Sequence, residues 1–145
     1  MKKSIQIAIT KTTSPEELDL LNEISKLVET LDTLESSFEE RINNNKVLRG
    51  EKPTRLTRSK KIEINQYKKD ADDLANKLTK DFMLMENAKD IIQAIRSGFD
   101  SDITFWKQAV KYAHPADLPI VDEFLAAKIK LRDALTVYLN HKSGS

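Results

Sequence analysis

The side chains with the clearest chemical potential are the Lys and Arg residues of a segment between positions 41 and 69. This segment holds ten bases against Glu51 and Glu63, a net charge of +8. Cations spaced along a loop and a helix start can each neutralise one phosphate of a nucleic acid. The residues that we expect to contact phosphates or an acidic partner are Arg49, Lys52, Arg55, Arg58, Lys60, Lys61, Lys68 and Lys69.

The residues that precede this basic segment offer a rival explanation for it. Residues 15–40 hold nine acids and one base, a net charge of −8, and the whole chain sums to +1. The two blocks can therefore pair with each other, either across a helical hairpin or between two copies of the chain. Surface ion pairs contribute only about 0–1 kcal/mol each, but they set register and orientation. The sequence leaves both alternatives open.

The other reactive residue types form no recognised catalytic or metal-binding pattern. The chain has no Cys, which excludes disulfides, thiolate ligands and thiol nucleophiles. His114 and His141 lack the spacing of a zinc site, and the three Gly residues are too scattered for a phosphate-binding loop. Asp70, Asp72 and Asp73 lack the Gly and distal Glu of a calcium loop. We therefore expect a non-enzymatic protein with no catalytic residues, metal or cofactor and no evident small-molecule substrate.

Helices are the elements that must position these charges. Ser14, Pro15 and Glu17 form an N-terminal capping pattern for a helix over 14–44. Apolar residues then recur in the steps of three and four that mark a heptad seam, namely Leu20, Ile24, Leu27, Leu31, Leu34 and Phe38. This period favours packing against at least one other helix.

The rest of the chain also reads as helical. A basic loop over 45–59, marked by a glycine and a proline, leads into a second long helix over 60–97. The seam of this helix comprises Tyr67, Ala71, Leu74, Leu78, Met85, Ala88, Ile92 and Ile95. Two further helices are predicted over 101–114 and 117–140.

The first residues show a different period. Ile5, Ile7 and Ile9 alternate with polar or small residues, which is typical of a half-buried strand. An isolated strand leaves its edges unpaired. We therefore expect the strand to pair with residues 60–65, to pair with its own copy in a dimer, or to lie as an extended arm over 1–13.

These patterns predict a single all-α domain over residues 1–145. Its architecture is a long, coiled-coil-like antiparallel helical hairpin with two further C-terminal helices and a short extended N-terminal arm. The length fits one domain, and no apolar run approaches a membrane span. We expect the protein to be cytoplasmic.

Long heptad seams bury little unless other helices close over them. We therefore expect an interaction or assembly module, either a subunit of a homo-oligomer or part of a larger complex. Its interface residues would be Ile5, Ile7 and Ile9 together with the seam from Leu20 to Phe38. The alternative function is that of a small nucleic-acid-binding protein that uses residues 46–69 on phosphates.

Overall fold

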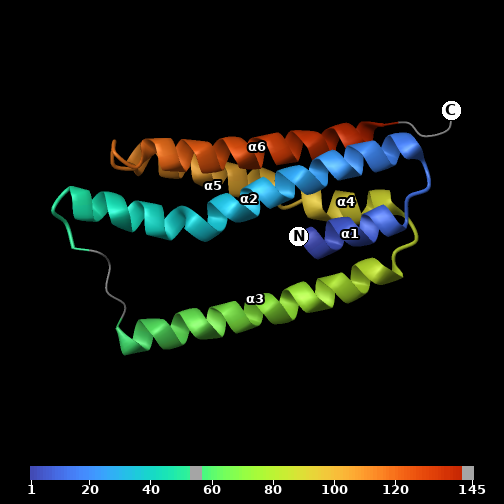
Figure 1. The fold of residues 1–145 in the computed structure, drawn as a ribbon. Helices are drawn as coiled ribbons and strands as arrows, with labels where there is room; N and C mark the ends of the chain where they lie inside the picture. The colour runs from blue at the N-terminus through green and yellow to red at the C-terminus, as the bar shows by residue number, and fades with distance from the viewer. Residues whose placement is uncertain (53–56, 142–145) are drawn as a thin grey trace.

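The computed structural model describes residues 1–52 and 57–141, and every regular element in these ranges is an α-helix. The helices in chain order are α1 (Lys2–Thr10), α2 (Pro15–Leu48), α3 (Arg58–Leu84), α4 (Ala88–Arg96), α5 (Phe99–Tyr112) and α6 (Leu118–Asn140) (Figure 1). This result confirms the all-α prediction. Within the described ranges, none of the helices is both long enough and apolar enough to cross a membrane.

The helices other than α3 pack around one hydrophobic core. α2 lies along α6, and α5, α4 and α1 close over the remaining sides of this pair. The largest buried side chains include Leu131, Leu135 and Tyr138 from α6, each fully buried. The ring of Phe38 lies 5.4 Å from that of Trp106 and joins α2 to α5. α6 therefore acts as the central helix of this body, in keeping with apolar residues on two of its sides.

The start of α2 follows the predicted capping pattern. The Ser14 hydroxyl accepts a hydrogen bond from the backbone N–H of Glu17 at 3.5 Å, and Pro15 occupies the first helical position. The end of α2 lies four residues beyond the predicted end at 44. The helix continues through Asn45 because that side chain donates to the Ala116 carbonyl at 3.0 Å, which anchors the extra turn to the start of α6.

Residues Lys2–Thr10 form the helix α1, which corrects the predicted strand and the extended arm over 1–13. Ile5 and Ala8 are fully buried, so this face of the helix packs into the core. A helix satisfies its backbone hydrogen bonds internally, whereas a single strand leaves its edges unpaired. The apolar residues of a run as short as 4–10 also fit a helix. The burial of Ile5 and Ala8 against the other helices favours the helix over the strand.

The predicted helix over 60–97 is two helices. Met85 and Asn87 both have extended backbones, with φ/ψ of −74°/134° and −107°/129°, and they end α3 and start α4. After this break, α4 turns its apolar side into the core, where Ile91 and Ile92 are fully buried. The break allows α4 to join the body while α3 leaves it (Figure 1).

The remaining boundaries lie close to the predicted ones. α5 begins two residues before the predicted range 101–114, and α6 differs from 117–140 by one residue at its start. Residues 60–65, the predicted partner of an N-terminal strand, lie in the first turns of α3. Neither segment therefore has the unpaired backbone groups of a strand edge.

The predicted hairpin concerns α2 and α3. These two helices run in opposite directions (Figure 1). The helix against which α2 packs most extensively is nevertheless α6, and α3 makes its main contacts with α1. A coiled-coil contact between α2 and α3 therefore stays a prediction.

We expect truncation of leucines on α6 and α3 to have very different effects on stability. Leu131→Ala opens a cavity in the core and should lower the free energy of unfolding by about 2–5 kcal/mol. Leu74→Ala, on an exposed part of α3, should lower it by less than about 0.5 kcal/mol. Urea denaturation followed by circular dichroism measures both. Equal losses would show that α3 is packed as firmly as α6 and would contradict this description of the fold.

Candidate functional site

The apolar residues predicted as an interface lie in the core or against it. Ile5, Ile24 and Leu31 are at most 4% exposed. The others are half-buried and pack on these core residues, namely Ile7, Ile9, Leu20, Leu27, Leu34 and Phe38. Helices of the same chain cover the buried members, so a second chain reaches them only if the body opens. Contact of the half-buried members with another chain stays a prediction.

The predicted basic residues fall into two groups. Arg49 is half-buried at the end of α2, where it forms ion pairs. The larger group is exposed on the first turns of α3 and consists of Arg58, Lys60, Lys61, Lys68 and Lys69. Lys52 is exposed in the connection between the two helices, and Arg55 lies outside the described residues. The structure thus brings five of the eight predicted cations onto one helix.

Arg49 has a structural partner at the start of α6. Its Nη1 lies 3.2 Å from Oδ1 of Asp117, which also accepts a hydrogen bond from Asn45 at 3.0 Å. Asp117 is only 8% exposed. Burial alone would raise the pKa of Asp117, but the hydrogen bonds from Asn45 and Arg49 and the positive charge of Arg49 together lower it below its ordinary value. Arg49 therefore joins α2 to α6 and is engaged within the chain.

The acidic residues of α2 form their described ion pairs with other parts of the chain. Glu29 Oε1 lies 3.5 Å from Nζ of Lys2 in α1, and Glu16 Oε2 lies 3.4 Å from Nε2 of His141. The side chains of Lys2 and Glu29 are both more than half exposed, and such surface pairs contribute little stability. The two pairs tie α2 to α1 and to the end of α6. Pairing of the acidic block with the cations of α3 stays a prediction.

α3 is the helix that the rest of the chain covers least. Of its residues, all of which the structure describes, Phe82 alone is buried. Tyr67 is 75% exposed, Leu74 57% and Leu78 41%. α3 contacts the body mainly through α1, and its long axis lies apart from α2, α5 and α6 (Figure 1).

Five apolar residues of α3 share one face. They recur in steps of three and four, and we call this set the α3 stripe: Ile64, Tyr67, Ala71, Leu74 and Leu78. Ile64 is half-buried, and the other four are exposed. Apolar periodicity shows that the helix has such a face, and it led us to expect that another helix covers it. The structure leaves the face open to solvent.

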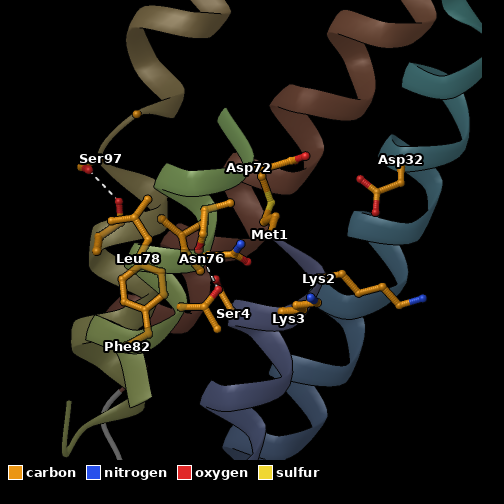
Figure 2. Close-up of a pocket in the computed structure, with 15 residues that line it drawn as sticks. Met1, Lys2, Lys3, Ser4, Asp32, Asp72, Asn76, Leu78, Phe82 and Ser97 are labelled. Carbon is orange, nitrogen blue, oxygen red and sulfur yellow. Dashed lines mark hydrogen bonds between the residues drawn. The ribbon is translucent and has the colours of Figure 1, made fainter. Parts of the chain in front are cut away.

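A cavity of about 800 Å³ lies where α3 meets the body. Phe82 and Leu78 of α3 form part of its wall, and Lys2 and Lys3 of α1 line another part (Figure 2). Asp72 also lines it, so charges of both signs surround it. The cavity is the space between α3 and the body beside the contact of Phe82, and it borders the α3 stripe at Leu78.

The remaining candidate residues have local partners. Nδ1 of His114 accepts a hydrogen bond from the backbone N–H of Ala116 at 3.0 Å, which closes the turn before α6. Oδ1 of Asp70 accepts from Gln66 at 2.9 Å, one turn earlier in α3. Within the described ranges, His, Asp and Glu form no group of three or more that could hold a metal ion. These residues therefore add no second candidate site.

No protein-family model, curated protein or solved structure matches this sequence. The α3 stripe and the cations beside it are therefore the starting point for a function.

We expect Asp117 to give the protein a pH-dependent stability. Because its pKa is lower in the folded chain than in the unfolded chain, where it is about 3.9, the contribution is present above about pH 4. It is lost as pH falls through the folded value. Asp117→Asn should therefore lower the free energy of unfolding at pH 7, on the order of 1–3 kcal/mol, and flatten its decline between about pH 5 and 2.

Urea denaturation at several pH values measures this effect. The control is Asp122→Asn, which removes the same charge at an exposed position of α6. If Asp117→Asn and Asp122→Asn give the same profile, the junction between α2 and α6 does not depend on this carboxylate.

Proposed function

We propose that this protein is a non-enzymatic helical interaction module and that the α3 stripe is its binding surface. The observation that carries the proposal is the exposure of a heptad-spaced apolar face on a helix that the body barely covers. Tyr67, Leu74 and Leu78 are between 41% and 75% exposed on this one face. Contiguous exposed apolar side chains of this kind favour a macromolecular contact.

The energetics of apolar burial support the same proposal. Full burial of one leucine-sized side chain yields about 1.5–3 kcal/mol, and each large residue of the stripe, already covered in part, would contribute a fraction of that amount. Most helical stability in proteins comes from packing of an apolar face, because isolated short helices are marginal in water. α3 has 27 residues, and Phe82 near its end is its one buried residue in the described chain. A partner on the stripe would therefore stabilise the helix as well as bind it.

The composition of the stripe favours a protein partner. Leucines and a tyrosine at heptad spacing are the residues with which one helix packs on another or in a hydrophobic groove. Tyr is enriched among the residues that dominate protein interfaces. Tyr67 is the aromatic residue of the stripe and one of its most exposed members.

A second candidate function is nucleic-acid binding through the start of α3. One observation favours it: Arg58, Lys61 and Lys68 are exposed and fall within about 80° of one another around the helix axis, at 100° per residue. Such a row can follow phosphates, and each contact would add to the salt dependence of binding. The row lies next to the stripe, so a single experiment on α3 can separate the two functions.

Site-specific photo-crosslinking in the cells that produce the protein tests the proposal. A benzophenone amino acid replaces Tyr67 in the stripe, or Ile62 in a matched control. Ile62 is 61% exposed and lies about 140° around the same helix from Tyr67. We expect covalent protein adducts from position 67 that position 62 does not give.

Two results would count against the proposal. Adducts with nucleic acid, together with duplex binding that weakens steeply as salt rises, would replace it with the second function. Absence of any adduct at position 67 in folded, expressed protein would contradict a binding role for the stripe.

A further inference from the structure

Resting on the proposed function, we infer that the partner of the α3 stripe is the same stripe of a second copy, packed antiparallel about a twofold axis near Ala71. A twofold contact places one patch against an identical patch, so the patch must complement itself. The exposed residues of α3 meet this requirement in shape and in charge.

The apolar residues are arranged almost symmetrically about Ala71. Ile64 and Leu78 lie seven residues to either side, and Tyr67 and Leu74 lie four and three residues away. Antiparallel pairing therefore sets Ile64 of each copy near Leu78 of the other, and Tyr67 near Leu74. The smallest side chain of the stripe sits at the centre, where the two helices would approach most closely.

The charges of α3 change sign close to the same point, between Lys69 and Asp70. Residues 58–69 carry five bases and one acid, a net charge of +4, and residues 70–84 carry four acids and two bases, a net charge of −2. Antiparallel pairing places each basic half against an acidic half, whereas parallel pairing places like charges together. Charge therefore selects the antiparallel orientation.

Apart from Ile64, which is half-buried, the side chains that would take part are exposed. Lys60 forms an ion pair with Glu63 at 3.5 Å on the same helix, and both side chains are more than two-thirds exposed. Such an exposed pair is weak, so it competes little with ion pairs between the two copies. Leu74 is 57% exposed at the centre of the surface. Because the contact uses one helix from each copy, it is small, and we expect a dissociation constant on the order of 1–100 µM.

Light scattering after size exclusion tests the inference on the purified full chain in about 0.1 M salt. From about 1 to about 300 µM we expect the mass to rise from 16.6 kDa toward twice that value. Leu74→Lys should weaken the dimer at least about tenfold. The matched control, Ile62→Lys, changes an equally exposed residue on another face of α3 and should leave the dimer intact.

Charge reversal gives a second, independent readout. An acidic variant carries Lys60→Glu, Lys61→Glu and Lys68→Glu, which makes residues 58–69 net −2. A basic variant carries Asp70→Lys, Asp72→Lys and Asp73→Lys, which makes residues 70–84 net +4. Each variant alone has one sign along all of α3 and should stay monomeric, whereas a 1:1 mixture of the two should form a dimer.

Any one of three results would overturn the inference. The natural chain could stay monomeric at about 300 µM, the dimer could survive Leu74→Lys, or the mixture of the charge variants could fail to associate. A monomeric chain that still crosslinks through position 67 to a different protein would overturn self-association and leave the proposed function in place. Loss of crosslinking as well would remove both.

Discussion

The packing of α2 against α6 is the contact on which the other helices depend. Leu21, Ile24 and Val28 of α2 and Leu131, Leu135 and Tyr138 of α6 are all buried to within 1%, and α1, α4 and α5 cover the sides of this pair. The polar junction of Arg49 and Asn45 with Asp117 holds the end of α2 to the start of α6. These helices cover both apolar sides of α6. The body covers α3 mainly at Phe82, and the remaining apolar face of α3 is exposed to solvent.

The charge blocks acquire different roles in this architecture. The acidic block lies on a helix whose apolar side is committed to the core and whose acids pair in part with Lys2 and His141. Most of the described basic block lies on α3, where its charge adjoins the exposed stripe. The acidic block and most of the described basic block thus lie on different helices, α2 and α3. The charges within α3 itself, basic up to Lys69 and acidic from Asp70, are the ones on which the proposed dimer rests.

Much of the helical architecture could be predicted, because caps and apolar period are local signals. Ser14 and Pro15 identify the start of α2, and the range of α6 follows from its apolar positions. The helix α1 was missed, because the alternation of Ile5, Ile7 and Ile9 fits a strand and a short helix alike. The break after Met85 was missed because the apolar period continues across it. The cations and the apolar seam of α3 could be predicted from the sequence. Periodicity shows which face of a helix is apolar, but it does not show what covers that face. The role of Arg49 depends on Asp117, which is 68 residues away.

We propose that α3 lies outside the cooperative core of a single chain and is protected by a partner. Native-state hydrogen exchange at high dilution tests this most directly, since amides in poorly packed helices open with little free energy. We predict that amides of residues 60–75 exchange far faster than those around Leu131, and that their protection rises with protein concentration. Protection along α3 equal to that of α6 in the dilute monomer would show that a single chain packs α3 as firmly as its core.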